Sequence, residues 1–290
     1  MTGRTIGVLH PGEMGAAIGR GLVEQGHTVL WVAAGRSPAT AARARAAGLA
    51  DAGSLAGLLG RAEVVLSVCP PQAAPAVAEE VAKGGFGGLF VDANAIAPRT
   101  VRAVAATVTK AGATFVDGGI IGTPPQPGDG PGPRLYLAGE GAPQVAALFA
   151  GTPVGTELVD GGVGAASAVK MAYAAWTKGT SALLLTARAL ARAERVEGTL
   201  LAEWGVSQPG LSRRVEQAAN AAASKGWRWD PEMTEIATAM ADAGLPDGFH
   251  TAAAEVYRCS PRADPAGLAE SAPGDVVELV LEALTGEHLG

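Results

Sequence analysis

The first half of the chain alternates short apolar runs with helical stretches, and this pattern limits the fold more than any other feature. The apolar runs are residues 6–9, 28–33, 64–69, 89–92 and 114–117, and all but the last are followed by a helical stretch. Apolar strands separated by helices are typical of a parallel sheet with both faces covered. Two further strands, at 134–138 and 154–159, are expected to extend the sheet.

The pattern changes after residue 117. Residues 118–133 are rich in Gly and Pro and are expected to form a loop. From residue 161 the strand pattern stops, and one long helix is expected over 164–194, with a length of about 45 Å at 1.5 Å per residue. Shorter helices are expected near residues 199–204, 211–224, 231–243 and 249–257, and the pattern weakens after 261.

A glycine-containing turn joins the first strand to the first helix. It consists of His10, Pro11, Gly12, Glu13, Met14 and Gly15. A dinucleotide-binding turn needs glycine at three places, for the tight turn, for the approach of the pyrophosphate and for helix–strand packing. Gly12 and Gly15 fit the second and third places, whereas His10 occupies the first. His10 either lines the cofactor site or is an ordinary turn residue.

The turn completes a fold prediction. Because it opens a helix directly after the first strand, its free backbone amides are placed to hold a phosphate. We therefore expect an α/β N-terminal Rossmann domain with a parallel sheet over residues 1–160. An all-α C-terminal domain built on the one long helix is expected over residues 161–290, as a substrate and dimerisation domain.

The end of the second strand bears on the choice between NAD and NADP. An acidic residue there would bind the ribose hydroxyls of NAD. This chain has Arg36 and Ser37 instead, which offer a cation and a hydroxyl to a 2′-phosphate. Ser37 is also suited to cap the following helix. The sequence therefore favours NADP(H) over NAD(H).

Three more residues follow strands at the edge where such sheets bind ligands. Cys69 and Pro70 end the third apolar run and are expected to contact the cofactor through their backbone. Otherwise Cys69 acts as a small buried hydrophobe. Asn94 follows the fourth run, and its amide either contacts the nicotinamide ribose or the substrate, or serves the turn.

Three segments together resemble the β-hydroxyacid dehydrogenase and 6-phosphogluconate dehydrogenase superfamily. The turn at 12–15 resembles its Gly-x-Met-Gly, and residues 115–122 resemble its substrate loop. Residues 161–170 resemble the Gly-x-x-Gly-x-x-x-Lys run that opens its long helix. The resemblance covers nearly the whole chain. More narrowly, the segments 91–94, 117–122, 170–179 and 244–250 resemble a branch known only as NAD(P)-dependent oxidoreductases.

The resemblance implies that Lys170 is the catalytic proton donor, and the residues favour the same role. Lys170 lies early in an otherwise apolar helix, where burial eases the loss of its proton. The alternative is a lysine that extends its amine to solvent. Tyr173, three residues later on nearly the same face, either binds the substrate oxygen and orients Lys170 or packs in the core.

The resemblance also suggests a substrate region, with two departures. Ile120, Ile121 and Gly122 lie in the expected loop, but the family's serine is replaced by Ile121 and its helix Asn by Tyr173. Specificity for 3-hydroxyisobutyrate or 6-phosphogluconate is therefore not expected. In the C-terminal half the candidates for the substrate wall are Trp227, Trp229, Asp247 and His250. The two tryptophans are equally suited to the core, and His250 to a helix start.

Composition narrows the remaining possibilities. The net charge is −6 with no Lys/Arg cluster, so nucleic acid is not an expected partner. The two cysteines are far apart and give no metal signature, and no apolar run is long enough to span a membrane. We expect a cytoplasmic homodimer that acts as an NADPH-dependent reductase of a small carbonyl, without a metal. The alternatives are an imine reductase of the same architecture and a non-catalytic NADP-binding sensor.

Overall fold

The computed structural model describes residues 3–125, 132–263, 267, 271 and 273–286. The chain forms two compact units, residues 1–171 and 172–290. The division lies within the long helix α7 (Ala165–Ala193), whereas the sequence places the boundary before this helix, near residue 160. The difference arises because the first turns of α7 pack on the sheet of the first unit.

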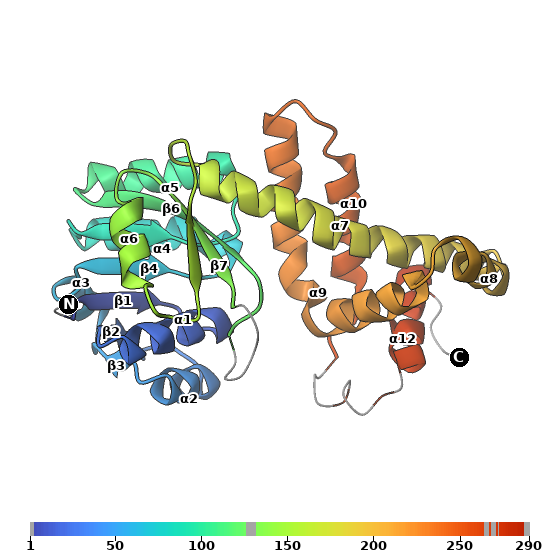
Figure 1. The fold of residues 1–290 in the computed structure, drawn as a ribbon, viewed down its shortest axis with the longest axis horizontal. Coiled ribbons are helices and arrows are strands. Elements are labelled where there is room, and N and C mark those ends of the chain that lie inside the picture. The colour runs from blue at the N-terminus through green and yellow to red at the C-terminus, as the bar shows by residue number, and fades with distance from the viewer. Residues whose placement is uncertain (1–2, 126–131, 264–266, 268–270, 272, 287–290) are drawn as a thin grey trace. The chain divides into compact units, whose positions relative to one another are not determined.

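The first unit is built on one sheet. Its strands are β1 (Thr5–Leu9), β2 (Thr28–Trp31), β3 (Ala50–Asp51), β4 (Val64–Ser67), β5 (Leu89–Asp92), β6 (Thr114–Ile121), β7 (Arg134–Ala138) and β8 (Gly155–Leu158). The order across the described sheet is β3-β2-β1-β4-β5-β6-β7-β8 (Figure 1). All neighbours run parallel except β6 and β7, which are antiparallel. The expected sheet is therefore confirmed, with one reversed pair that the sequence did not reveal.

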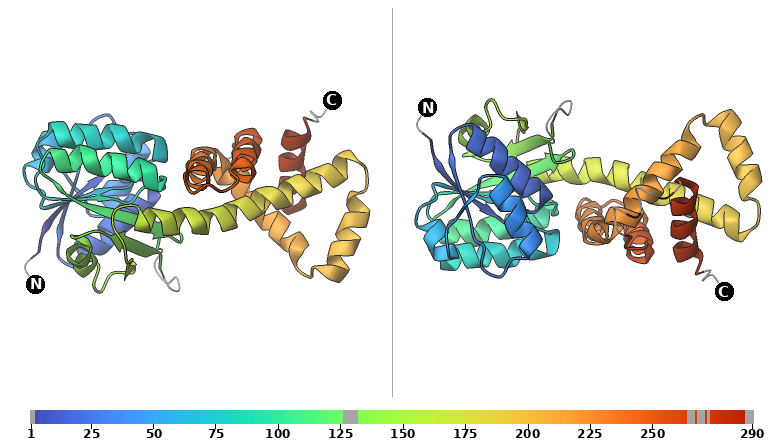
Figure 2. Two further views of the ribbon diagram at one scale, coloured as in Figure 1. Left: turned by 90° about the horizontal axis from the view of Figure 1, so that it is seen from above. Right: turned by 90° about the horizontal axis from the view of Figure 1, so that it is seen from below.

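Helices cover both faces of the sheet, as the continuous apolar strands require (Figure 2). One face packs against α1 (Glu13–Glu24), α2 (Pro38–Ala46) and α6 (Ala142–Leu148). The other packs against α3 (Leu55–Leu59), α4 (Ala74–Lys83) and α5 (Pro98–Lys110). A short 3-10 turn, η1 (Pro71–Ala73), precedes α4. β3 and α3 were not predicted, because both are too short to show a period.

The expected loop over residues 118–133 is partly wrong. Gly118–Ile121 continue β6 and pair with β7, with Gly119 opposite Tyr136. Glycine-rich sequence disfavours a strand locally, but here pairing with β7, the next strand along the chain, decides the conformation. Residues 126–131 of the expected loop lie outside the described residues.

The second unit is helical. Besides most of α7 it contains α8 (Glu197–Ser207), α9 (Leu211–Asp242), α10 (Gly248–Cys259) and α12 (Pro273–Thr285). Helices α8, α10 and α12 pack against α9. No helix among the described residues is long and apolar enough to span a membrane.

Helix α9 corrects the prediction of two separate helices at 211–224 and 231–243. Pro231 lies inside it, where it removes one backbone hydrogen bond. The buried face of α9 nevertheless continues on both sides of the proline, from Ala222 and Gly226 to Met233 and Ile236. This burial outweighs the local cost of the proline, and the sequence pattern alone does not reveal it.

Candidate functional site

The turn after β1 has the geometry of a phosphate-binding turn. The Gly12 amide donates a 2.7 Å hydrogen bond to the His10 carbonyl, which closes it. A β-carbon at Gly15 would lie 3.0 Å from the His10 carbonyl oxygen and 3.6 Å from Val8 Cγ1, so α1 approaches β1 only because residue 15 is glycine. A β-carbon at Gly12 would meet only the His10 carbonyl oxygen, at 4.0 Å. The turn is therefore open on the side from which a pyrophosphate would approach the α1 amides.

The remaining turn residues serve different purposes. Pro11 is buried, Met14 packs against the core, and Glu13 is exposed at the first position of α1. Without a side-chain cap at Gly12, the first amides of α1 depend on other acceptors. These residues fit the diphosphate of a dinucleotide.

His10 is the unusual member of the turn. Its φ angle is 64°, a left-handed conformation that favours glycine. Its Nδ1 atom is buried and has no hydrogen-bond partner within the described residues. Burial, and to a lesser extent the nearby charge of Arg36, lowers the pKa of His10 to about 4. The imidazole is therefore neutral at physiological pH.

The loop after β2 carries the residues expected to distinguish NADP from NAD. Arg36 and Ser37 are both exposed. The Ser37 Oγ accepts a hydrogen bond from the Thr40 amide at 3.2 Å, so Ser37 caps α2, as the sequence allows. The charge of Arg36 influences the ionisation of both His10 and Cys69.

Asn94 ties two loops together. Its Oδ1 accepts from the Cys69 amide, and its Nδ2 donates to Ser67 Oγ at 3.1 Å and to Asp92 Oδ2 at 2.9 Å. Asn94 is 2% exposed and uses both amide hydrogens in these bonds, so its amide group acts within the protein rather than on a ligand. The reading of Asn94 as a turn residue therefore fits the structure better than that of a cofactor contact.

The same network explains the ionisation of its neighbours. Burial raises the pKa of Asp92 to about 7, against the hydrogen bonds that Asn94 donates to it. Burial also raises the pKa of the Cys69 thiol to about 12, so this thiol is no nucleophile at neutral pH. Pro70, which follows, is exposed and available for contact through its backbone.

Lys170 is positioned by β6. A β-carbon at Gly119 would lie 3.1 Å from Lys170 Cβ and 2.7 Å from the Ala166 carbonyl oxygen, so the first turns of α7 lie directly on the strand. Asp117 lies two residues before Gly119, on the same face of β6. Its carboxylate accepts hydrogen bonds from the Gly164 amide (2.8 Å), the Ser167 amide (3.2 Å) and the Ser167 hydroxyl (2.6 Å).

Asp117 therefore clamps the start of the helix that carries Lys170. Burial raises its pKa, while the hydrogen bonds from Ser167 oppose the shift. Sequence reasoning did not assign a role to Asp117 or Ser167, which are fifty residues apart. Only the contact of β6 with α7 reveals this pair, because the two residues lie in separate segments and no local pattern links them.

Two expected substrate residues are buried. Ile120 and Ile121 belong to β6 and are 8% and 4% exposed. Ile120 packs in the core beneath α1, α2 and α6. Gly122 follows the strand with a φ angle of 121° and is exposed.

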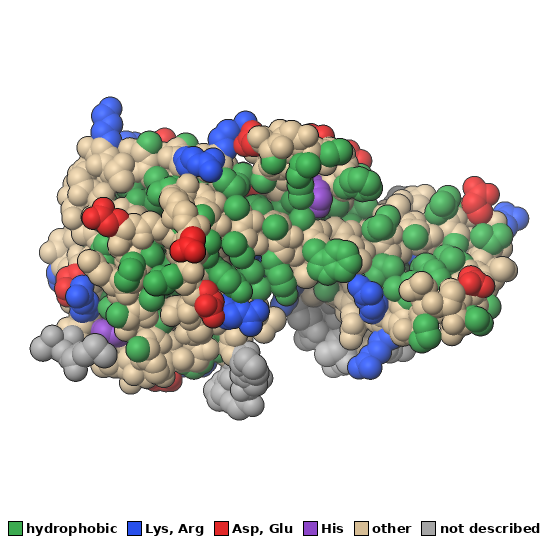
Figure 3. Space-filling view, turned by 45° about the horizontal axis from the view of Figure 1, so that its top comes forward, with side chains coloured by type: hydrophobic (Ala, Val, Ile, Leu, Met, Phe, Trp, Pro, Cys, Tyr) green, Lys and Arg blue, Asp and Glu red, His purple; other side chains and the backbone are tan. Residues whose placement is uncertain are grey.

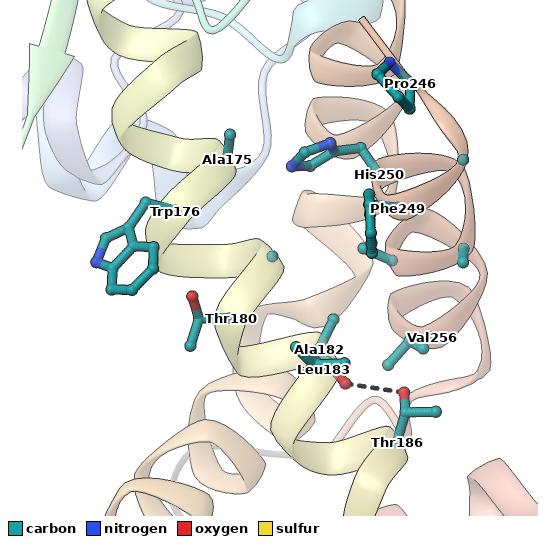
Figure 4. A pocket seen from close by; sticks show the side chains of 14 residues that line it. Ala175, Trp176, Thr180, Ala182, Leu183, Thr186, Pro246, Phe249, His250 and Val256 are labelled. Atoms are coloured by element: carbon teal, nitrogen blue, oxygen red, sulfur yellow. Dashed lines mark hydrogen bonds between the residues drawn. The ribbon is translucent and has the colours of Figure 1, made fainter. Parts of the chain in front are cut away.

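The second unit contains a pocket of about 590 Å³ between α7 and α10. Figure 4 shows Trp176, Thr180 and Leu183 on one side and Phe249 and His250 on the other, with the His250 ring directed toward α7. The Nδ1 atom of His250 is buried without a partner within the described residues. His250 thus lines a cavity whose walls are almost entirely apolar, and its role toward a substrate stays a prediction.

The other candidates of the second unit lie elsewhere. Tyr173 is 46% exposed on α7, and Trp227 is 44% exposed on α9, beneath the guanidinium groups of Arg228 and Arg262. Asp247 is exposed and immediately precedes α10. Figure 3 shows exposed hydrophobic side chains spread among few charges over the helices of this unit.

A buried ion pair in this unit escaped sequence reasoning. Lys178 of α7 bonds to Glu232 of α9, and the Lys178 amine lies 5.3 Å from the centre of the Trp229 ring. Trp229 in turn meets the Tyr257 ring edge-on at 5.0 Å, and the Tyr257 hydroxyl donates to the Lys178 carbonyl at 2.6 Å. Trp229 is therefore a core anchor. No group of three or more His, Cys, Asp or Glu residues in the described part of the chain is arranged to hold a metal.

Comparison with known proteins agrees with this geometry. Residues 5–134 match the NAD binding domain of 6-phosphogluconate dehydrogenase. This match covers less than half of the chain and identifies the cofactor-binding domain of the first unit. Residues 191–259 match a domain of unknown function, DUF1932. The resemblance deduced from the glycine turn and the Lys170 segment is thus confirmed, and the family of the first unit indicates an NAD(P)-dependent oxidoreductase.

Solved structures share the whole architecture. A conserved hypothetical protein from Sinorhizobium meliloti 1021 is 26% identical, with 98% of this chain and 97% of that chain covered and a TM-score of 0.68. A 3-hydroxyisobutyrate dehydrogenase from Mycobacterium tuberculosis, solved with L-serine, is 20% identical, with 96% and 99% covered and a TM-score of 0.68.

A reductive aminase from Aspergillus terreus, solved with NADPH and ethyl levulinate, is 19% identical. The alignment covers 96% of this chain and 99% of that one, with a TM-score of 0.55. At these identities the last two structures support the fold alone. None of the curated proteins compared with the chain matches it.

Proposed function

We propose that this protein is an NADPH-dependent reductase of a small carbonyl compound, with Lys170 as the proton donor. The observation that carries the proposal is the placement of Lys170. The clamp of Asp117 and the glycine at 119 hold the start of α7 on β6. The glycine turn that fits a dinucleotide lies in the same unit, at the end of β1.

The chain's residues would divide the work as follows. The α1 amides bind the diphosphate, and Arg36 meets the 2′-phosphate at the end of β2. When bound, NADPH supplies the hydride for the carbonyl carbon. The carbonyl oxygen then gains the electron pair of the broken π bond, and the Lys170 ammonium donates a proton to it. Lys170 regains its proton from solvent before the next turnover.

The experiment compares the wild-type protein with a Lys170→Met variant. Binding of NADPH and NADH is followed by nicotinamide fluorescence, and oxidation of NADPH is then measured against panels of aldehydes, ketoacids and imines. We expect NADPH to bind more tightly than NADH, and turnover with at least one carbonyl to fall roughly 100-fold or more in the variant. Unchanged turnover in the variant would eliminate Lys170 as the donor.

The same panels separate two other functions. Turnover of imines alone would favour an imine reductase, a function that the reductive aminase of the same fold makes worth testing. Tight cofactor binding without turnover of any panel would favour a sensor. Both outcomes leave the first unit as the cofactor-binding unit and change only the chemistry assigned to Lys170.

We also infer that the chain acts as a homodimer through α7. Trp176, Leu183 and Leu190 are 70%, 64% and 64% exposed and lie seven residues apart, so they form one apolar stripe along the helix. A seven-residue apolar repeat is suited to a partner helix, and a second copy supplies one with the same stripe.

Analytical ultracentrifugation tests this inference. We expect a dimer for the wild type and a monomer for Leu183→Glu, because a charge would be buried in the interface. Leu158→Glu is the matched control, since Leu158 is 57% exposed but lies on β8. A wild-type monomer, or equal behaviour of the two variants, would refute the inference.

A further inference from the structure

His10 occupies a position that the backbone reserves for glycine. Among the described residues only His10 and Arg195 combine a side chain with a positive φ angle. A β-carbon in this conformation costs about 1 kcal/mol relative to glycine. The turn itself remains tight, because the Gly12 amide still bonds to the His10 carbonyl at 2.7 Å. The imidazole therefore stands in the turn at an energetic cost that the turn geometry does not require.

The ring presents one usable nitrogen. Nδ1 is buried with no partner within the described residues, whereas the side chain as a whole is only partly buried. A proton on Nδ1 would be buried without an acceptor, so the neutral ring is expected to carry its proton on Nε2. Because burial and Arg36 hold the pKa of His10 near 4, this N–H is a donor without charge.

His10 and Arg36 belong to neighbouring strands. β1 pairs with β2, and the side chains follow the ends of these strands. The charge of Arg36 acts on both His10 and Cys69. The α1 amides serve the diphosphate, whereas Arg36 is on the ribose side of the site. A neutral donor after β1 and a cation after the neighbouring β2 suit an anion that accepts hydrogen bonds from both.

We propose that His10 is a specificity residue for NADP(H), which donates its Nε2–H to the 2′-phosphate of the adenosine ribose while Arg36 binds the same phosphate. This inference rests on the proposed NADPH dependence. It explains why a histidine replaces the first glycine of the turn: the side chain reaches a phosphate that NAD(H) lacks. The 2′-hydroxyl of NAD(H) gains little from it.

The test measures dissociation constants of NADPH and NADH by nicotinamide fluorescence for wild type, His10→Gly and His10→Asn. Loss of one hydrogen bond to a charged phosphate corresponds to a roughly 10- to 100-fold weaker affinity for NADPH in His10→Gly. Affinity for NADH is expected to stay within about twofold of wild type. His10→Asn is expected to recover part of the loss, because asparagine tolerates the left-handed conformation and keeps an amide donor.

The matched control is His27→Asn. The His27 Nδ1 accepts a hydrogen bond from the Arg4 amide, and the residue precedes β2 at the opposite edge of the sheet. We expect this variant to bind both cofactors as wild type does. Glycine suits the φ angle of residue 10, so a thermal melt of His10→Gly should show an intact fold.

Several outcomes would overturn the proposal. An equal loss for both cofactors would show that His10 serves the diphosphate or the turn. An equal gain for both would show that the imidazole obstructs the site. If wild type binds NADPH and NADH equally and His10→Gly changes neither, the specificity role fails while cofactor binding stands. If wild type binds neither cofactor, the proposed function itself fails.

Discussion

Replacing Gly119 by alanine should push Lys170, the proposed proton donor, out of place. The new methyl group would lie 2.7 Å from the Ala166 carbonyl oxygen and 3.1 Å from Lys170 Cβ. Carbon atoms prefer separations of about 3.5–4.0 Å, so α7 must retreat by roughly 0.5–1 Å. β6 is buried and paired on both sides, by β5 and β7, and therefore yields little.

The size of the effect follows from overpacking. Forcing a methyl group into a packed contact costs about 1–3 kcal/mol. For a unit of this size we expect the Tm to fall by roughly 3–10 °C. A displacement of Lys170 by this amount should reduce turnover by roughly 10- to 100-fold. NADPH affinity should stay within about twofold, because the glycine turn lies on β1 and not on β6.

The assay combines differential scanning calorimetry with NADPH oxidation on whichever substrate the panels identify. Gly162→Ala is the matched control, since a methyl group at Gly162 would meet no atom within 4 Å. If the Tm of Gly119→Ala lies within about 1 °C of that of the control and its rate of NADPH oxidation is normal, the close contact of β6 with α7 does not position Lys170.

Three further predictions concern buried polar groups. Because burial raises the pKa of Asp92 from 3.8 to about 7, its contribution to stability is complete below pH 4 and is lost as the pH rises through about 7. The free energy of unfolding measured with urea should therefore fall by roughly 4 kcal/mol at most as the pH rises. In Asp92→Asn the unfolding free energy should depend less on pH. An equal pH dependence in both proteins would contradict the raised pKa of Asp92. Ser167→Ala removes the 2.6 Å bond to Asp117 and should cost about 1–3 kcal/mol of unfolding free energy. Glu232→Gln, which leaves the partly buried Lys178 amine facing a neutral amide, should cost about 2–4 kcal/mol, and adding Lys178→Met should restore part of it.

The polar networks share one physical purpose. Asn94 joins the loops after β4 and β5, and Asp117 joins β6 to the start of α7. Both are fully or nearly buried, where an unpaired polar group is costly, so both contacts hold one arrangement of the backbone. The loops and the helix that border the candidate site are thereby fixed by residues that need not touch a ligand.

The sequence by itself determined the order of the longer strands and helices in the first unit and the turn from His10 to Gly15. These features are local, because apolar periodicity and turn chemistry act over a few neighbouring residues. For the same reason the long helix, with Lys170 near its start, was predictable. The family resemblance supports the role proposed for Lys170, which no local pattern could prove.

Only the tertiary structure decided the rest. Whether residues 118–121 form a loop or a strand depends on β7, and whether Pro231 breaks a helix depends on the faces that α9 buries. The hydrogen bond of Ser167 to Asp117 and that of Asn94 to Ser67 each join segments far apart in the chain. Contacts of this kind carry no local signal, because their energy is gained only when distant segments are packed together.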